Sequence, residues 1–245
     1  MGKESESKKN NCMSMYNLLK DAVPKDHSRQ VTSQYFADEI LRSKNIHNVM
    51  DLGCGAGRSA GYFLIKNPYI KWVGVDIESS PEVSSRSRTD GKFVTFNGAD
   101  LPFNNNSFDM IFSNQVFQYV RYPRKLLGEI RRVLSPGGYF IGSVSYLEPY
   151  TSMSTWNYTP YGFKVLIEEA GMELKEIRPS IDALTLIIRR ILRHSKFFGR
   201  YWEKESPLNK LINFAGFLMR KKHDEINLIK LLFCGQFVFL VQKAV

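Results

Sequence analysis

The sequence predicts an α/β fold in which a mostly parallel sheet carries helices on both faces. A short apolar strand at Val49–Leu52 runs directly into the glycine-rich turn Gly53–Gly57. A second apolar strand, Lys71–Val75, ends at the acidic residue Asp76. The segment 107–115 then holds a near-continuous apolar run, which is typical of a strand that is buried on both faces.

A length of 245 residues suits one α/β domain with an insertion. We expect residues 1–25 to be a polar, disordered tail and lead-in, and residues 26–245 to form the single domain. The tail lacks the apolar core of a signal peptide, and no apolar run reaches the ~18 residues of a membrane span. Three widely spaced cysteines show neither metal-ligand spacing nor a disulfide framework, which favours a reducing, cytoplasmic compartment and no bound metal.

The glycine turn and Asp76 together predict a nucleoside site. Glycine lets a ligand lie against bare backbone, and Asp76 follows the first glycine at about the 20-residue spacing of an acid that binds both ribose hydroxyls. Gly53, Gly55 and Gly57 give G-x-G-x-G, whereas a dinucleotide-binding turn has G-x-G-x-x-G. Arg58 stands where the third glycine of that turn would be, so the sequence disfavours an NAD site.

This turn, with the segments that follow it, resembles motif I of the class I S-adenosylmethionine (SAM) methyltransferases over residues 45–180. The resemblance implies a Rossmann-like, seven-stranded sheet and an enzyme that takes SAM as cofactor and releases S-adenosylhomocysteine. It also implies a set of residues that contacts the cofactor. The set consists of Asp51, Gly53, Cys54, Gly55, Gly57, Arg58, Asp76, Ile77, Asp100, Leu101, Asn114, Gln115 and Gln118.

The second half of this set surrounds the adenine and the methyl donor. In the resembling family an acid at the position of Asp100 receives the adenine amino group, and the next residue, here Leu101, packs on the ring. Asn114 and Gln115 emerge at the carboxyl end of the fourth strand, where ligands bind in open α/β sheets. Gln118 follows, where the family lines the methyl-donor end of the site. The alternative for Gln118 is a polar group on a helix surface.

Local signals place the remaining elements. A helix is expected over Pro123–Leu134, because proline suits the first helical turn and apolar residues recur at helical spacing. The turn Ser135–Gly138 then ends the helix, and the strand Tyr139–Val144 follows. The later elements are a helix from Thr159 to Ala170, a strand at Glu173–Ile177 and a terminal strand at Leu231–Val241.

The acceptor is expected beyond the carboxyl ends of the fourth and fifth strands. Methyl transfer depends on holding donor and acceptor in line, and an alcohol acceptor also needs a base to remove its proton. Glu148 is a weak candidate for that base, and Tyr119, Tyr146 and Tyr150 are weaker ones. Substrate contact or packing is the alternative role for each. The segment 26–44 is expected to form a helix that folds over the site as a lid.

The chemical class of the acceptor is less well indicated. The run Tyr158–Phe163, with the helix after it, resembles small-molecule and glycan-directed members of the family. The leading expectation is therefore a small-molecule acceptor, either a sugar hydroxyl or a lipid-linked glycan. A quinone or other lipid methylated on carbon or oxygen, and a non-catalytic SAM-binding protein, are the alternatives. The sequence does not indicate an oligomeric state.

A basic, apolar segment at 184–230 departs from the minimal family pattern. The chain has a formal net charge of +10, and this segment holds eleven Lys or Arg residues but only four Asp or Glu. We expect two or three helices inserted before the last strand. A helical cap with a solvated basic face, a peripheral contact with anionic lipid at the inner membrane face, and nucleic-acid binding are the three interpretations. Nucleic acid is disfavoured, because Ser113–Phe117 lacks the Pro-Pro motif of nucleobase amino methyltransferases.

Overall fold

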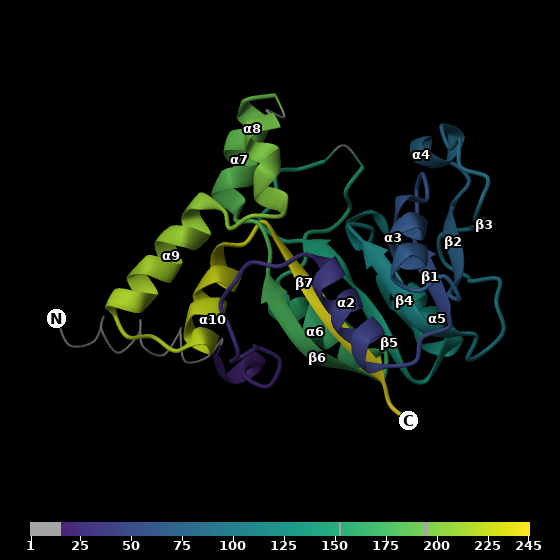
Figure 1. Ribbon diagram of the computed structural model, residues 1–245, viewed down its shortest axis with the longest axis horizontal. Coiled ribbons are helices and arrows are strands. Elements are labelled where there is room, and N and C mark those ends of the chain that lie inside the picture. The colour runs from purple at the N-terminus through teal and green to yellow at the C-terminus, as the bar shows by residue number, and fades with distance from the viewer. Residues whose placement is uncertain (1–15, 152, 194–195) are drawn as a thin grey trace.

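The computed structural model describes residues 16–151, 153–193 and 196–245 (Figure 1). One seven-stranded sheet runs through them in the order β3-β2-β1-β4-β5-β7-β6. The strands are β1 (Asn48–Leu52), β2 (Lys71–Ile77), β3 (Lys92–Phe96), β4 (Phe108–Asn114), β5 (Leu134–Ser145), β6 (Met172–Pro179) and β7 (Gln236–Lys243). Strands β1 to β5 pair in parallel, whereas β7 is antiparallel to both β5 and β6. The predicted seven-stranded, mostly parallel sheet is confirmed.

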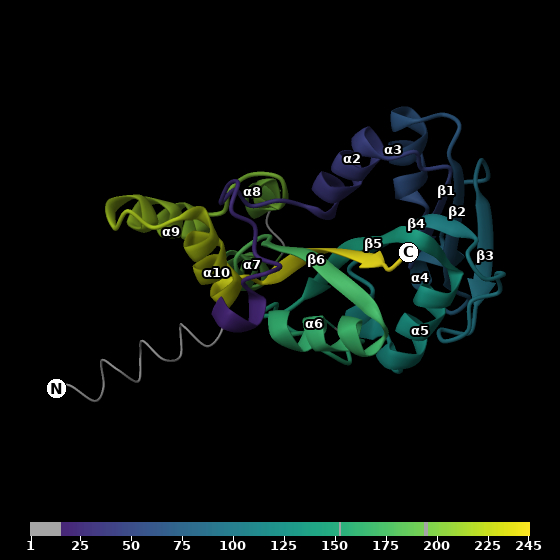
Figure 2. The same ribbon diagram turned by 90° about the horizontal axis from the view of Figure 1, so that it is seen from below.

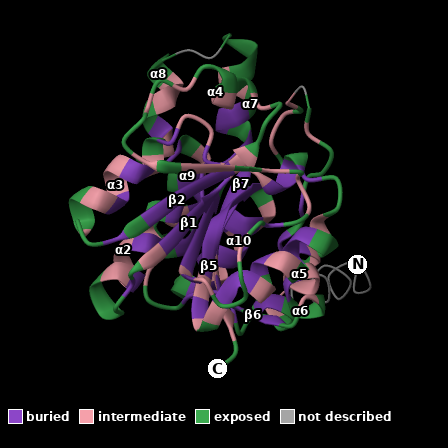
Figure 3. Ribbon diagram, turned by 90° about the vertical axis from the view of Figure 1, so that its right-hand side faces the viewer, coloured by how far each residue is buried: buried purple, intermediate pink, exposed green. Residues whose placement is uncertain are grey.

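Helices cover both faces of the sheet, as predicted (Figure 2). The helices of the first two thirds of the chain are α2 (Ser33–Ser43), α3 (Arg58–Lys66), α4 (Pro81–Ser84), α5 (Pro123–Val133) and α6 (Pro160–Glu169), with a short 3-10 helix η1 (Phe117–Tyr119). On one face, Phe36 of α2 and Phe63 of α3 belong to the apolar cluster of β1 residue Val49. On the other face, Leu127 of α5 and Phe163 of α6 share a cluster with the neighbouring strand residues. Figure 3 shows the buried strands between these layers.

The N-terminal part of the described chain is folded onto the domain. Residues 1–15 of the predicted tail lie outside the described residues, whereas Leu19, Ala22 and Val23 of the lead-in are buried in the core. The helix predicted over 26–44 begins only at Ser33, so the first part of that prediction is wrong. Residues 26–32 are not helical, and the carboxylate of Asp26 accepts two N–H bonds from Arg178 of β6.

The predicted turn Ser135–Gly138 is part of a strand. Helix α5 ends at Val133, and β5 begins at once with Leu134, so the expected gap between helix and strand is wrong. Leu134 pairs with Phe108, but the next pair joins Tyr139 to Met110. The proline and glycines therefore form a bulge in β5. Bulges commonly hold residues that interrupt the regular pairing of strands.

The insertion before the last strand is helical, as predicted, and forms more elements than expected. It contains α7 (Ala183–Ile191), α8 (Lys196–Gly199), the 3-10 helix η2 (Arg200–Trp202), α9 (Pro207–Leu218) and α10 (His223–Phe233). The predicted start of the terminal strand at Leu231 is wrong, because α10 continues to Phe233 and β7 begins at Gln236. Leu231 is fully buried on that helix. None of the helices in the described ranges is both long and apolar enough to cross a bilayer.

Candidate cofactor and acceptor site

The glycine turn lies at the carboxyl ends of β1 and β2. The backbone N–H groups of Gly53 and Cys54 donate to the carbonyl oxygen of Val75 at 2.7 and 3.2 Å. Gly53 has a φ of +73°, and a Cβ there would lie 2.2 Å from a methyl group of Val116. Only glycine fits this position, because a side chain would be strained in its backbone and would overlap the segment after β4. The turn is thus held open as bare backbone.

Asp76 closes the turn from the end of β2. Its carboxylate accepts the backbone N–H of Gly55 at 2.7 Å and that of Ile77 at 2.8 Å. An ionised carboxylate has about four acceptor positions, so two remain for a ligand. The half-buried carboxylate therefore stands beside the glycine turn with capacity for a pair of hydroxyl groups, as the sequence predicted for a ribose.

Asp51 lies buried below the same turn. The hydroxyl of Ser59 donates to its carboxylate, and the indole N–H of Trp72 donates to Ser59 Oγ at 3.1 Å. Burial, with a smaller contribution from the charge of Asp76, raises the pKa of Asp51 to about 7. A cation bound above this carboxyl group would favour its ionised form. Burial likewise raises the pKa of Cys54 to about 12, so that thiol is a neutral packing group.

Two arginines that were not predicted from the sequence form hydrogen bonds to backbone carbonyl groups of the glycine turn. The guanidinium of Arg86 donates to the carbonyl oxygen of Gly55 at 2.9 and 2.7 Å and lies 3.9 Å from the centre of the Phe93 ring. Arg88 donates to the carbonyl oxygen of Gly57 at 3.1 Å. Both arginines follow α4 in a polar stretch without periodicity, so no sequence signal marked them. By contrast Arg58, at the start of α3, is exposed.

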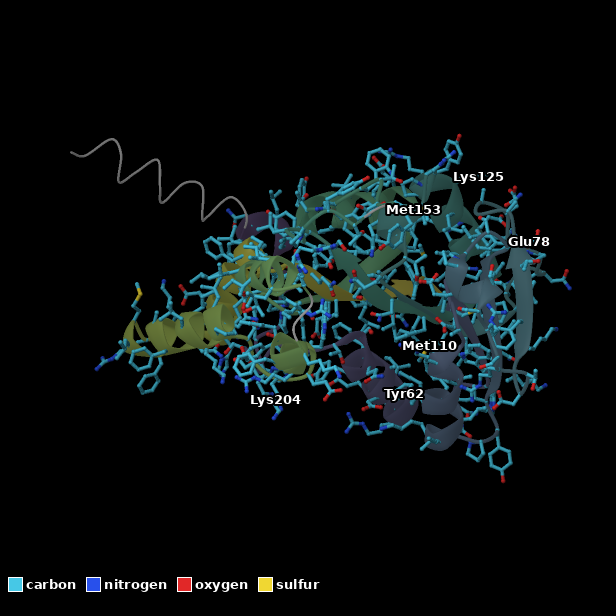
Figure 4. All side chains as sticks on the ribbon, turned by 90° about the horizontal axis from the view of Figure 1, so that it is seen from above. Tyr62, Glu78, Met110, Lys125, Met153 and Lys204 are labelled. Atoms are coloured by element: carbon cyan, nitrogen blue, oxygen red, sulfur yellow. The ribbon has the colours of Figure 1, made fainter. Side chains whose placement is uncertain are left out.

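An open depression of about 560 Å³ lies beside Asp76. It is lined by Ile77, Glu78, Ser79, Phe96 and Asn97. Of the predicted cofactor contacts, Ile77 is part of this lining. Glu78, on its rim, and Lys125 lie towards the β2–β3 side of the molecule (Figure 4).

The two predicted adenine contacts, Asp100 and Leu101, are not part of this lining. The exposed carboxylate of Asp100 accepts the Asn97 amide at 2.9 Å and the Lys125 ammonium at 2.7 Å. The bond from Lys125 is the main reason that the pKa of Asp100 is lowered. Leu101 is buried in the core. Asp100 is thus one hydrogen bond from the depression, through Asn97, and Leu101 lies beneath the surface.

Hydroxyl and amide groups form a connected network where β4 and β5 end. Asn114 Oδ1 accepts the hydroxyls of Ser33, at 3.0 Å, and Ser143, at 2.5 Å. Gln115, which has a φ of +60°, donates its side-chain amide to Ser143 Oγ at 2.9 Å. Its Oε1 lies 3.0 Å from Ser145 Oγ. The first residue of α2 is therefore tied to the fourth and fifth strands at the end where a ligand is expected.

Glu148 is the far end of this network. Its carboxylate accepts the hydroxyl of Ser145 at 2.6 Å and the side-chain amide of Gln236 at 2.7 Å. The second of these bonds joins residues 88 positions apart, so the sequence could not have indicated the role of Gln236. The Ser-Val-Ser spacing at 143–145, which places two hydroxyls on one side of a strand, was a usable signal.

Gln118 lies inside the molecule, so its alternative interpretation as a helix-surface group is wrong. The side chain is 3% exposed. Its amide donates to Gln115 O at 3.0 Å and to Gln115 Oε1 at 3.1 Å, whereas its own Oε1 is buried without a hydrogen-bond donor among the described residues. The Gln118 carbonyl oxygen accepts the N–H groups of Thr155 and Trp156 at 2.6 and 3.1 Å. Gln118 therefore joins the Gln115 network to the loop after β5.

The three tyrosine candidates occupy different environments. The hydroxyl of Tyr119 lies 3.1 Å from Thr151 Oγ1 at an exposed position. Tyr146 packs against the core, and burial raises the pKa of its hydroxyl. Tyr150 is exposed, and its carbonyl oxygen accepts a guanidinium N–H of Arg190 at 3.3 Å. Of the four candidates for the base, Glu148 is the one placed in the network of Asn114 and Gln115.

Comparisons with known proteins agree with this geometry. Residues 50–142 match the family model described as Methyltransferase domain. The demethylmenaquinone methyltransferase of Thermotoga maritima is 29% identical over 134 residues, which cover 54% of this chain and 58% of that protein. A probable phthiotriol/phenolphthiotriol dimycocerosates methyltransferase 2 of Mycobacterium ulcerans is 30% identical over 164 residues, covering 62% and 60%. The chain thus aligns with less than two thirds of the length of these relatives.

The same fold occurs among solved structures. The Galdieria sulphuraria protein assigned provisionally as a sarcosine dimethylglycine methyltransferase superimposes with a TM-score of 0.59 at 16% identity. That superposition covers 96% of this chain and 98% of the other. The sheet order, the glycine turn with its acid at the end of β2, and the matched domain lead to one conclusion. The chain has the fold of the class I methyltransferases, whose cofactor is S-adenosylmethionine, and its residues 50–142 match their methyltransferase domain.

Proposed function

We propose that this chain is an SAM-dependent methyltransferase that acts on a small-molecule acceptor. The observation that carries the proposal is the carboxylate of Asp76, held 2.7 Å from the Gly55 N–H beside a turn of bare glycine backbone. This is the arrangement that an adenosine ribose requires. The family and its cofactor give the chemistry, because SAM supplies an electrophilic methyl group on a sulfonium cation.

The residues of the site fit this cofactor. The turn Gly53–Gly57 would hold the methionine part, Asp76 the ribose hydroxyls, and the depression at Ile77 the adenine. The buried Oε1 of Gln118, which has no donor among the described residues, is suited to accept a hydrogen bond from a ligand. Asp51, with its pKa near 7, would stabilise a positively charged ligand in its ionised form.

Glu148 is the group we assign to the acceptor's proton. A sugar or other hydroxyl placed at the carboxyl ends of β4 and β5 would donate its proton to this carboxylate as its oxygen takes the methyl group, whose bond to the sulfonium sulfur breaks so that S-adenosylhomocysteine leaves. Ser145 and Gln236 hold the carboxylate in one orientation, which is what in-line transfer demands of a base.

The acceptor is, in this proposal, a sugar hydroxyl or a lipid-linked glycan. The names of the Thermotoga and Mycobacterium relatives favour a second candidate, a quinone or other lipid, because both describe methyltransferases of lipid-like molecules. In either case the free thiols of Cys54 and Cys234 suit a reducing compartment such as the cytoplasm. A lipid-linked acceptor would bring the segment 184–230 to a membrane surface.

Calorimetric titration of SAM into the wild-type chain and into Asp76→Ala tests the proposal. We expect micromolar binding that weakens at least ~tenfold, about 1.4 kcal/mol, in the variant. Asp109→Ala is the matched control, because Asp109 also accepts two backbone N–H groups, from His47 and Asn48 at 2.9 Å, but at the opposite end of the sheet. Its SAM affinity should stay at the wild-type value.

Failure of the folded wild-type chain to bind SAM would contradict the proposal. Binding of reduced nicotinamide cofactor, read by its fluorescence, would favour an oxidoreductase instead. SAM binding without methyl transfer to sugar, lipid-linked or quinone acceptors would favour the non-catalytic SAM-binding alternative.

A further inference from the structure

Helix α9 exposes its largest apolar side chains to solvent. Phe217 is 78% exposed, and the same face carries several more exposed apolar residues. They are Leu211, Phe214, Leu218 and, directly after the helix, Met219. The spacing of 211, 214 and 218 puts these residues on one helical face. An amphipathic helix of a globular domain normally turns such a face inward, so α9 has the opposite arrangement.

Polar contacts fix this orientation. Asn209 is fully buried, and its side-chain amide donates to Gln30 Oε1 at 2.7 Å and to Ser180 O at 3.0 Å. Gly216 is also on the inner side, where a Cβ would lie 2.7 Å from the Ile226 side chain of α10. Rotating the apolar face inward would break both bonds of Asn209 and separate α9 from α10. The exposed apolar face is therefore built into the fold.

The charged residues of α9 and of the turn that follows it are all cationic. From Ser206 to His223 the sequence contains no Asp or Glu, whereas it contains Lys210, Arg220, Lys221 and Lys222. Lys210, Arg220 and Lys222 are exposed. Lys210 stands within the helix and the other three follow its end. The apolar face is thus bordered by cations.

The position of α9 makes the face accessible. The helix projects from the sheet on the side opposite β3, in both Figure 1 and Figure 2. A flat surface could meet its outer side without contacting the glycine turn or Asp76, which lie towards the other end of the molecule.

We propose that the outer face of α9 docks on an anionic lipid bilayer. Phenylalanine and leucine side chains would enter the boundary between headgroups and acyl chains, and the bordering lysines and arginines would bind the anionic headgroups. Nucleic acid suits this surface less, because it would leave the exposed Phe and Leu side chains in water. A second copy of the chain suits it less as well, because two faces with the same cationic border would repel each other.

Helix α7 contacts both α9 and the acceptor side of the domain. Helix α7 packs against α9, and its Arg190 bonds to Tyr150 in the loop that follows Glu148. Ile187 and Ile191 of α7 are exposed apolar residues as well. If the proposed methyltransferase function holds, on which this last step rests, docking through α9 brings the acceptor side of the domain to the membrane that carries a lipid-linked substrate.

Co-sedimentation with vesicles tests the docking surface. We expect the full chain to bind vesicles of phosphatidylcholine and phosphatidylglycerol at low salt, and to bind pure phosphatidylcholine more weakly. The double variant F214S/F217S should lower the partition coefficient at least ~tenfold. Ile65→Ser is the matched control, because Ile65 is 84% exposed on α3, far from α9, and its variant should bind like the wild type.

A charge-reversed variant separates the electrostatic contribution to vesicle binding from the apolar contribution. R220E/K222E should lower binding to the anionic vesicles and weaken its dependence on salt, with little change on pure phosphatidylcholine. Calorimetric SAM binding of every variant tests the proposed function separately from vesicle binding, and retained SAM binding shows that a variant is folded. Vesicle binding without SAM binding would leave the docking surface intact and remove the enzyme proposal.

Three results would overturn the docking proposal. The first is no binding of the wild type to anionic vesicles at low salt, and the second is binding that F214S/F217S does not reduce. The third is a different occupant. A wild-type dimer in light scattering that F214S/F217S converts to a monomer would identify a second copy of the chain, and binding to single-stranded RNA but not to vesicles would identify nucleic acid.

Discussion

The guanidinium of Arg178 in β6 holds the carboxylate of Asp26 with two N–H bonds, of 2.9 and 2.8 Å, across 152 residues of sequence. Arg178 is 2% exposed, pairs also with Glu176, and lies 4.9 Å from the centre of the Tyr35 ring. The segment that leads into α2 is therefore fastened to the sheet before the helix begins. Because Ser33 at the start of α2 contacts Asn114, this bond also sets the position of α2 at the site.

Arg178→Met should lower the free energy of unfolding by about 3–5 kcal/mol, because it leaves Glu176 as an uncompensated, largely buried carboxylate. Urea unfolding followed by circular dichroism measures the change. Lys175→Met in the same strand is the control, since Lys175 pairs at the surface with Glu173 and should change stability by less than about 1 kcal/mol. Equal losses in the two variants would contradict the anchoring role of Arg178.

Gly53→Ala should destabilise the chain by about 2 kcal/mol or more and abolish SAM binding. The φ of +73° strains any residue with a Cβ, and that atom would overlap Val116. The double variant G53A/V116A should recover part of the stability, because it removes the overlap but not the backbone strain. Thermal unfolding and SAM titration of both variants give the two readings. If Gly53→Ala alone had the stability of the wild type, the turn would be able to rearrange around the added Cβ.

SAM affinity should rise as the pH increases from about 6 to 8. The pKa of Asp51 is about 7 in the folded chain, so the buried carboxyl group gains its charge over this range and then favours a cationic ligand. Asp51→Asn should bind SAM with little dependence on pH in this range. Titrations in buffers of different ionisation enthalpy would show proton release on binding by the wild type alone. An affinity that is flat with pH in the wild type would exclude this role.

The same carboxyl group predicts the pH dependence of stability. The pKa of Asp51 is about 7 in the folded chain, above the 3.8 of the unfolded chain. The contribution of this group to the free energy of unfolding is therefore fully present below pH 3.8 and is lost as the pH rises through 7. Relative to Asp51→Asn, the wild type should therefore lose stability between these values. Urea midpoints of the two proteins at several pH values measure the difference, and parallel curves would contradict it.

Glu148→Gln should lower kcat by about 10²- to 10⁴-fold if this group removes the acceptor proton, while SAM affinity stays within about a factor of three. Gln236→Leu should give a smaller loss in kcat, because the carboxylate remains but loses the amide that orients it. Thr151→Val is a control from the adjoining loop that removes the hydroxyl near Tyr119. Measurement needs an acceptor found by screening sugars, lipid-linked sugars and quinones. Full kcat in Glu148→Gln would move the base elsewhere.

Local sequence was sufficient where one kind of residue dominates a segment. Strands β1, β2 and β4 could be predicted because apolar runs end at polar residues or glycine, and the seven-stranded, mostly parallel sheet followed from the resemblance. Prediction from local sequence failed where contacts with other parts of the chain decide where a helix or strand begins and ends. The start of α2 depends on Asp26 reaching Arg178, and the end of α10 depends on how one apolar run divides between a helix and β7.

In the site, too, some positions could be predicted from the sequence and others could not. The place of Gly53 in the turn and that of Asp76 at the end of β2 could be recognised, because they depend on residue type and spacing alone. Arg86 and Gln236 could not, because they act through bonds to residues far along the chain, Gly55 and Glu148 respectively. Asp100 and Leu101 were placed by family position, and their surroundings depend on Lys125 and on the core rather than on the turn that contains them.

The place of β7 between β5 and β6 has a consequence for synthesis of the chain. β5 and β6 leave the ribosome well before Gln236–Lys243, and until then their facing edges have no strand between them. A nascent chain thus carries two open strand edges while the whole helical insertion is being made, and such edges can pair with neighbouring chains. Glu148 also lacks its Gln236 partner during this interval. The sheet and the acceptor end of the site are therefore completed together, by the same late strand.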